Sequence, residues 1–391
     1  MMLLMKYVKI LVAMNVQCQL MERGNGGDFL LCRVTAMSVK TGEVLDVEVM
    51  SKSCMSCRMH AKEDKKSPSY QTWLADHVPV CSCNYKGSSP NMEPVGVGRL
   101  FLRSVQNRGL LYTQYLGDGD SKSFKTVSEL DPYDGKEIVK LECVGHYQKR
   151  LGKGLRQLVK TKKVGGKGKL TQALIDKLQN YFGIALSSNT ESVEKMKRAM
   201  WASMFHVAAN DSQPLHAKCP LGEDSWCTYQ VAKAKGIPYK HEGPGIPIAV
   251  IRQMKPVYER LTDDKMLQKC LHGKTQNINE SFNGMIWKRC PKETYVGHAT
   301  LNLCVMDAVC HYNRGPEVEL DILRKMGIEP GLNTTTGVSS SKVVKDIMKR
   351  NQATPEARSR RRYLRGRKKM KVDRETTAEG ITYEGWRILT A

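Results

Sequence analysis

The stretch that decides the fold class spans residues 30–50 and reads LLCRVTAMSVKTGEVLDVEVM. Two apolar segments flank the turn residues Thr41 and Gly42, and in the second segment aliphatic residues alternate with Asp46 and Glu48. Alternation with a period of two on either side of a short turn predicts a β-hairpin. The same alternation predicts that the two acidic side chains lie on an exposed face of the hairpin.

Strands and helices both follow this hairpin. Residues 95–109 predict a helix, residues 110–117 predict a strand that runs into a glycine turn, and a second helix begins at Ser121. Alternation returns in IVKLECVGH, residues 138–146, whereas residues 150–272 have helical periodicity and few β-branched runs. A strand-rich first part and a helical middle part predict a mixed α/β fold with a helical insertion.

The opening segment, MMLLMKYVKILVAM, is apolar, but Lys6 and Lys9 interrupt it and no small-residue cleavage site follows. We interpret it as a buried strand or a ragged gene start, not as a signal peptide. Because no apolar run reaches the roughly 18 residues that a membrane span needs, we expect no membrane association. Thirteen cysteines, several at metal-ligand spacing, fit the reducing conditions of the cytosol or nucleus.

Positive charge dominates the composition, since 62 Lys and Arg residues among 391 outweigh 39 Asp and Glu and give a net charge of +23. Residues 149–169 and 358–371 each hold nine basic residues and no acidic one. One such run is typical of a solvated surface, but two favour contact with nucleic-acid phosphates. The second run follows Pro355, predicts a disordered arm and fits a nuclear-localisation signal. The residues expected to contact DNA are Lys149, Arg150, Lys153, Arg156, Lys160, Lys162, Lys163, Arg360, Arg361, Arg362, Arg367, Lys368 and Lys369.

Two groups of cysteine and histidine have the spacing of metal ligands. The first joins C-x-x-C and H-x-x-x-C pairs in a polar insertion that zinc would organise, and its predicted ligands are Cys54, Cys57, His77 and Cys81. Cys83 is an alternative to Cys81, and His60 is a further candidate. The second group either binds a second zinc ion or forms a loop pinned by Trp226, and its members are His206, His216, Cys219 and Cys227.

Carboxylates at two places are candidates for a divalent cation. Asp118 and Asp120 directly follow a predicted strand, where a carboxylate can bind Mg²⁺, although an ordinary Asp-Gly turn is the simpler interpretation. Glu280 lies on a predicted helix whose polar face is nearly uncharged; the amides of that face are Gln276, Asn279 and Asn283. This face is either reserved for a function or consists of residues that cap the helix start.

Cys143 and His146 form a C-x-x-H pair at the end of a predicted strand. Two ligands alone rarely hold zinc, so a buried cysteine and a hydrogen-bonded histidine are the default interpretation.

Six ordered blocks together resemble the Mutator-like transposase domain of animal DNA transposons. They are NYKGSSPNMEP, YLGDGDSKSF, LECVGHYQKRLG, CPLGEDSWC, CLHGKTQNINESFN and IWKRCPK. Their order and spacing match from about residue 34 to residue 308, and EGITYEGW near the end is similar to the tail of these proteins.

The resemblance implies an RNase H-like core sheet with a D-D-E carboxylate set. The division that follows is a core first part at 1–50 and 90–150, a zinc-knuckle-like insertion at 51–89, a helical insertion at 151–272, a core helix with the last carboxylate at 273–315, and a C-terminal region with the basic arm at 316–391.

The resemblance also implies site roles. Asp118 matches the second carboxylate, with Asp120 as the alternative, and Glu280 matches the third, while Cys143 and His146 match a C-x-x-H signature. The implied chemistry is phosphoryl transfer with two Mg²⁺ (or Mn²⁺) ions at the terminal inverted repeats of double-stranded DNA. The resemblance further implies a homo-oligomer on DNA. Together with the basic tail that fits a nuclear-localisation signal, this DNA partner places the expected location in the nucleus.

The sequence departs from the family at its first carboxylate, which lies in a motif resembling D-G-T-W-Q-K-R-G. Arg23 and Gly24 keep the end of this motif, which puts Gln17 where the aspartate belongs. A DNA-binding module is also expected upstream and is not seen; a truncated or misjoined gene, or a decayed or domesticated copy, would explain both. We therefore expect either a catalytically impaired transposase-derived protein or a non-catalytic DNA-binding or chromatin protein on the same fold.

Overall fold

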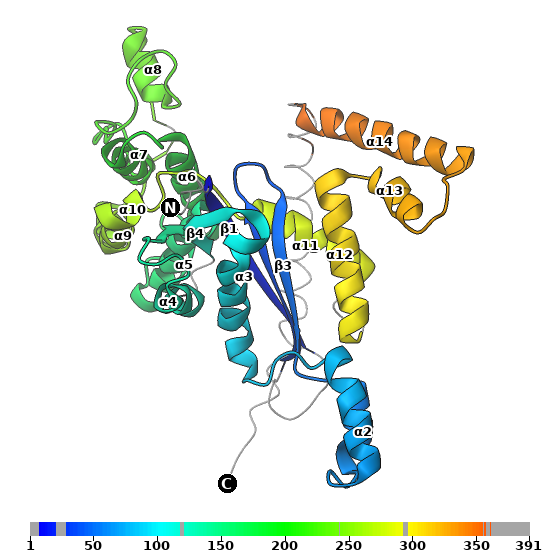
Figure 1. Ribbon diagram of the computed structural model, residues 1–391. Coiled ribbons are helices and arrows are strands. Elements are labelled where there is room, and N and C mark those ends of the chain that lie inside the picture. Colours follow the sequence, from blue (N-terminus) through cyan, green and yellow to red (C-terminus); the bar gives the residue numbers. More distant parts are fainter. Residues whose placement is uncertain are drawn as a thin grey trace, which may run out of the picture. The chain divides into compact units, whose positions relative to one another are not determined.

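The computed structural model describes residues 8–20, 29–117, 121–241, 243–291, 296–354, 356 and 360. It is a mixed α/β protein that divides into two compact units, residues 1–309 and residues 310–391 (Figure 1). No helix in the described part of the chain is both long enough and apolar enough to cross a membrane.

A five-stranded mixed sheet lies in the first unit, with the strand order β3-β2-β1-β4-β5. The strands are β1 (Val8–Leu20), β2 (Phe29–Ser38), β3 (Val44–Ser51), β4 (Leu110–Gly117) and β5 (Val139–Glu142). β1, β2 and β3 pair antiparallel, whereas β4 pairs parallel with both β1 and β5. The predicted hairpin is confirmed as β2 and β3, and Gly42 in its turn has φ +79°, a conformation that favours glycine.

Helix α3 (Met92–Arg108) covers one face of this sheet and contacts β1, β2, β3 and β4 (Figure 1). It ends at Gly109, whose φ of +63° is the left-handed conformation common after a helix. Phe101 on α3 packs edge-on against Tyr112 of β4 at 5.3 Å, and α4 (Ser121–Leu130) packs beside α3. This side of the sheet is therefore an apolar core.

Six helices follow β5, and all but the fourth of them contribute buried residues to an apolar core of their own. They are α5 (Val144–Lys162), α6 (Gln172–Ser188), α7 (Val193–His206), α8 (Thr228–Ala234), α9 (Ile248–Leu261) and α10 (Asp264–Gln268). Phe182 and Tyr258 are fully buried in that core, and the Tyr147 hydroxyl donates to the Leu261 carbonyl at 3.0 Å. Because α5 starts directly after β5, these helices are joined to the sheet at its edge.

The remaining elements are short helices after β3 and helices at the C-terminal end. The first group comprises α1 (Met55–Met59), η1 (His60–Lys62), α2 (Pro68–His77), η2 (Val78–Val80) and η3 (Ser89–Asn91). The second comprises α11 (Asn277–Arg289), α12 (His298–Arg314), α13 (Val318–Lys325) and α14 (Leu332–Ala353). Within the second unit, Lys342 Nζ on α14 binds Glu317 Oε1 at 2.7 Å.

A glycine allows α3 to approach the sheet closely, and this gives a testable prediction. A Cβ atom at Gly96 would lie 2.5 Å from Val34 Cγ2 and 2.6 Å from Met50 Cε. We expect Gly96→Ala to lower the free energy of unfolding by about 1–3 kcal/mol, measured by urea denaturation, because the added methyl group would overpack the core. Gly284 in α11 is the matched control, since nothing lies within 4 Å of its Cβ position and Gly284→Ala should stabilise by about 0.5–1 kcal/mol. Equal effects of the two substitutions would contradict the close approach.

Candidate functional site

Amide side chains at the start of α11 bind the backbone of two neighbouring parallel strands. Gln276 Nε2 donates to the carbonyls of Met14 in β1 and Leu116 in β4, at 2.9 and 3.1 Å. Asn279 Nδ2 donates to the same Met14 carbonyl at 3.2 Å, and both amide residues are buried. Gln276 is the N-cap residue of α11, but its side chain makes no capping bond. The uncharged face of this helix is therefore an anchor to the sheet.

A buried arginine of strand β2 contacts the same face of α11. Arg33 of β2 is 2% exposed, and its Nη2 donates to Asn283 Oδ1 at 3.0 Å. Its guanidinium carbon lies 5.4 Å from the ring centroid of Trp287, which is a cation–π distance. Burial lowers the pKa of Arg33 to about 10, so the side chain stays charged at neutral pH. The strand register pairs Arg33 with Gln17 of β1, the position predicted to lack the first carboxylate.

The predicted C-x-x-H pair and the predicted third carboxylate line one cavity of about 340 Å³. Cys143 and His146 lie at the start of α5, and Glu280 reaches the cavity from α11. Cys143 is 2% exposed and packs with Leu116 and Leu141, whereas Glu280 is exposed. The structure thus brings Cys143 and His146 beside Glu280, which lies more than 130 positions later in the chain.

The other predicted acids are placed less completely. Asp118 and Asp120 lie outside the described residues, although β4 ends at Gly117, directly after a carbonyl that Gln276 binds. The backbone of Gln17 is described in β1, but its side chain is not. In the described part of the chain, the residue groups that could hold a metal ion are both of the cysteine–histidine type. No magnesium site is therefore established.

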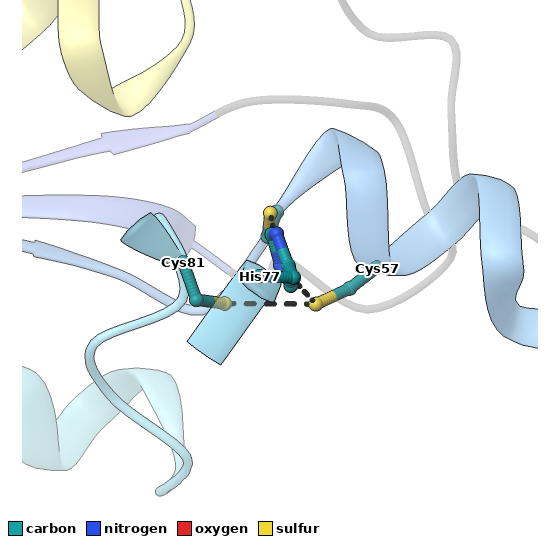
Figure 2. A group of neighbouring side chains, drawn as sticks. Cys57, His77 and Cys81 are labelled. Atoms are coloured by element: carbon teal, nitrogen blue, oxygen red, sulfur yellow. Dashed lines mark hydrogen bonds between the residues drawn. The ribbon is translucent and has the colours of Figure 1, made fainter. Parts of the chain in front are cut away.

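The first predicted cysteine–histidine group forms a compact cluster, the first cluster: Cys54, Cys57, His77 and Cys81 (Figure 2). The four ligand atoms all lie within 4.8 Å of one another. His77 Nε2 lies 3.4 Å from Cys54 Sγ and 3.1 Å from Cys57 Sγ, which in turn lies 3.6 Å from Cys81 Sγ. Zinc–ligand bonds of about 2.0 and 2.3 Å place tetrahedral ligand atoms roughly 3.5 Å apart, which matches these distances.

Local structure explains why these four residues meet. Cys54 is the N-cap residue of α1, Cys57 lies within that helix, and His77 ends α2. The alternative ligands are engaged elsewhere, because Cys83 Sγ bonds to the Lys52 carbonyl at 3.3 Å and His60 Nδ1 pairs with Glu63 at 2.8 Å.

The thiols of the first cluster perturb one another. Burial raises the pKa of Cys57 to about 12, and its hydrogen bonds with the neighbouring thiols act in the same direction. Burial also raises the pKa of Cys54, but hydrogen bonds from the backbone outweigh it and lower the value to about 6. A bound divalent cation would relieve the repulsion between such crowded thiolates.

The second predicted group also forms a compact cluster, the second cluster: His206, His216, Cys219 and Cys227. Distances from the Nδ1 atoms of the two histidines to the two sulfur atoms range from 3.4 to 3.9 Å. Burial lowers the pKa of His216 to about 4, which keeps this imidazole neutral as a metal ligand requires. Trp226 is 50% exposed and packs edge-on against His206 at 4.9 Å, so it borders the cluster and does not replace it.

Both clusters have the ligand types and distances of a closed tetrahedral zinc site. We next compared the whole chain with known protein families. The description of the matching family model is Mutator-like transposase, and it covers residues 8–227, which is more than half of the chain. The chain belongs to the Mutator-like transposase family. No curated protein and no solved structure shows significant similarity to it. The matched segment of this Mutator-like transposase begins with β1 and ends at Cys227, so it includes both clusters.

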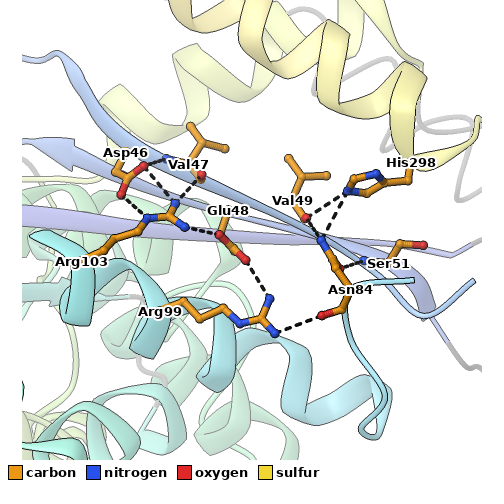
Figure 3. A network of polar contacts seen from close by, with 9 residues as sticks. All are labelled: Asp46, Val47, Glu48, Val49, Ser51, Asn84, Arg99, Arg103 and His298. Atoms are coloured by element: carbon orange, nitrogen blue, oxygen red, sulfur yellow. Dashed lines mark hydrogen bonds and ion pairs between the residues drawn. The ribbon is translucent and has the colours of Figure 1, made fainter. Parts of the chain in front are cut away.

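The acidic residues of β3 correct one prediction about this Mutator-like transposase. The exposed face expected for Asp46 and Glu48 is wrong, because α3 covers it and Asp46 is only 8% exposed (Figure 3). Arg103 binds both carboxylates, with Nε 2.7 Å from Asp46 Oδ2, and Arg99 Nη1 lies 2.8 Å from Glu48 Oε1. Both carboxylates are therefore held in ion pairs within the protein.

The basic residues of α5 divide into two kinds. Arg150 binds Glu142 Oε2 at 2.6 Å, and Arg156 Nη1 lies 3.4 Å from Asp176 Oδ1, so both are engaged within the protein. The lysines are exposed and form no ion pair in the described part of the chain: Lys149, Lys153, Lys160, Lys162 and Lys163. Of the predicted residues of the C-terminal arm, Arg360 is exposed, while Arg361, Arg362, Arg367, Lys368 and Lys369 lie outside the described residues.

The anchor between α11 and the sheet gives a testable prediction. Gln276→Glu would point a carboxylate at two carbonyl oxygens and remove two donated hydrogen bonds. Because the site is buried, we expect the free energy of unfolding to fall by about 3 kcal/mol, measured by urea denaturation. Asn277→Asp is the control on the neighbouring exposed residue and should change stability by less than about 0.5 kcal/mol. An unchanged Gln276→Glu variant would show that the two donated bonds do not hold the helix.

Proposed function

We propose that this protein is a transposase-derived DNA-binding protein whose catalytic core is impaired. The observation that carries the proposal is the position of Gln17, which stands where the family motif has aspartate and pairs in register with the buried Arg33. A two-metal site needs carboxylates to neutralise the ions, and here position 17 is a neutral residue whose partner in the strand register already carries positive charge. The residues present do not fit that metal pair, so we derive no cleavage step through magnesium.

The architecture supports an RNase H-like core. Three antiparallel strands are followed by two parallel ones in the order β3-β2-β1-β4-β5, and α11 returns to β1 and β4 with the predicted last carboxylate. We assign residues 1–50, 90–150 and 273–315 to that core, residues 51–89 and 151–272 to insertions, and residues 316–391 to a C-terminal region with the basic arm.

In an intact relative of this chain, the site would gather around the cavity at Glu280. We propose Asp118, or alternatively Asp120, as the second carboxylate and Glu280 as the third. Cys143 and His146 line the same cavity and would position groups at its wall. The alternative function is a non-catalytic DNA-binding or domesticated chromatin protein on the same fold, and the same surfaces would serve it.

We assign zinc to both clusters as a structural cofactor. Each cluster offers four cysteine or histidine ligands at tetrahedral distances, and such a complete set is typical of structural zinc. The first cluster joins α1 and α2, which otherwise bury no apolar residue between them, so the metal would supply the stability of that insertion.

Double-stranded DNA is the proposed partner, at the terminal inverted repeats of the transposon, with the chain acting as a homo-oligomer in the nucleus. The exposed lysines of α5 support this, since they give the helical insertion a positive surface without internal neutralisation.

The catalytic part of the proposal predicts that the chain as written does not nick a terminal-repeat duplex in Mg²⁺ or Mn²⁺. Gln17→Asp should gain nicking by at least about 10²-fold, because it restores the missing charge. Gln17→Asn is the neutral control, and Gln17→Asp combined with Glu280→Gln should again be inactive. A gel assay of labelled duplex measures nicking. Nicking by the unaltered chain would refute the proposed impairment. An inactive Gln17→Asp variant would refute the assignment of the impairment to position 17.

The binding part of the proposal predicts a change in salt dependence. Replacing Lys160, Lys162 and Lys163 with Gln should reduce the slope of log affinity against log salt by up to about 2.7, because three phosphate contacts are lost. Fluorescence anisotropy with duplex DNA at several salt concentrations measures this slope.

A matched control removes the same charge elsewhere. Lys195 and Lys255 are exposed, Lys197 is half-buried, and each is ion-paired with an acidic residue, so their replacement with Gln should leave the slope nearly unchanged. Equal slopes for the two triple variants would mean that α5 does not contact phosphate.

A further inference from the structure

A chain of polar contacts extends outward from the second cluster. His216 Nε2 lies 2.9 Å from Nε2 of His241, and His241 Nδ1 lies 2.8 Å from Asp211 Oδ1. The His241 backbone N–H donates to the same Asp211 oxygen at 2.9 Å. His216 is 2% exposed and the His241 side chain is 8% exposed, so the contact between the two rings is shielded from water.

The direction of these hydrogen bonds follows if His216 binds the metal. Its Nδ1 faces Cys219 and Cys227, so that nitrogen must be unprotonated to act as a ligand, and the proton of the neutral ring is then on Nε2. His216 Nε2 therefore donates to His241 Nε2, which must be unprotonated. The proton of neutral His241 is consequently on Nδ1, where Asp211 accepts it. Each ring nitrogen in the chain has one role.

His241 is not itself a ligand in this arrangement. One of its ring nitrogens faces His216 and the other faces Asp211, so neither is free for an ion. Tyr229 stacks on the His216 ring at a centroid distance of 4.4 Å and an angle of 15°, which fixes the ring plane from a second direction. The His216 imidazole is thus held by hydrogen bonding at its edge and by stacking on its face.

We propose that His241 and Asp211 are positioning residues for the second cluster, which fix the tautomer and orientation of His216 as a zinc ligand. The proposal rests on the assignment of zinc to that cluster. A carboxylate or imidazole that accepts the outer N–H of a ligating histidine makes the ligand more basic and holds it in place. It also accounts for the contacts of His241 with His216 and Asp211, which lie 25 and 30 positions away in the chain.

The test measures zinc affinity at each cluster separately in the full-length protein. Free zinc is set with a chelator buffer, bound zinc per chain is counted by native mass spectrometry, and alkylation of the cysteines reports which cluster is occupied. Protection of Cys219 and Cys227 reads the second cluster, and protection of Cys54 and Cys57 reads the first cluster as an internal control.

Three substitutions of His241 separate hydrogen bonding from packing, and a fourth substitution tests Asp211. His241→Ala and His241→Phe remove the acceptor, and Phe keeps a ring of similar size; both should weaken zinc binding at the second cluster by about 10–100-fold. His241→Gln keeps an acceptor and a donor and should restore most of the affinity. Asp211→Asn tests the outer carboxylate on an exposed residue, so its effect is not confounded by misfolding, and it should weaken binding by a smaller factor.

A second readout is direct. Long-range ¹H–¹⁵N correlation spectra of the zinc-loaded chain should show His216 protonated on Nε2 and His241 protonated on Nδ1. His241 protonated on Nε2 would overturn the proposal.

The other outcomes are distinguishable. Wild-type affinity in both His241→Ala and His241→Phe would overturn the positioning role, and loss in Ala with full affinity in Phe would assign the effect to packing and overturn it as well. A wild-type chain that binds only one zinc ion, at the first cluster, would refute the zinc assignment itself.

Discussion

The two hydrogen bonds from Gln276 to the carbonyls of Met14 and Leu116 are the contact on which the cavity at Glu280 depends. They join a helix near the end of the chain to two parallel strands, one of which lies 262 residues earlier. Glu280 follows on the next turn of that helix, and the cavity that it lines with Cys143 and His146 exists only while the helix stays in this place. A neutral amide suits the task, because it donates to two carbonyls without burying a charge.

Buried charges on the two faces of the sheet have different partners. On the α3 face, Arg103 and Arg99 neutralise Asp46 and Glu48, so a strand with two acids is buried without an unpaired charge. On the α11 face, Arg33 is buried with an amide and aromatic rings as partners. The first face is a structural core. The second is arranged around a buried positive charge.

Local patterns predicted the elements well, and distant partners account for the errors. The β2–β3 hairpin and the first cluster were predictable because a Thr-Gly turn and C-x-x-C spacing are properties of a few neighbouring residues. The burial of Asp46 was not, since its arginine partner lies 57 positions away. The uncharged face of α11 is visible in the sequence. The groups that accept hydrogen bonds from its amides are backbone carbonyls, however, which no side-chain pattern reveals. His241 was missed for a similar reason, because it lies 25 residues from His216 and has no metal-ligand spacing.

The buried Arg33 bears on the proposal that this core lacks a metal ligand at position 17, because the two residues are in register. Nη1 of Arg33 has no hydrogen-bond partner in the described part of the chain, while Nη2 is held by Asn283 and the ring of Trp287 lies beside the guanidinium. A carboxylate at position 17 would bring a negative charge to the strand position in register with Arg33, whereas glutamine is neutral. Divalent cations are repelled by such a charge and phosphate oxygens are attracted to it. At 2% exposure Arg33 is out of reach of DNA phosphate, so under the proposed function this charge acts against a divalent-cation pair, and the exposed lysines of the helical insertion act on DNA.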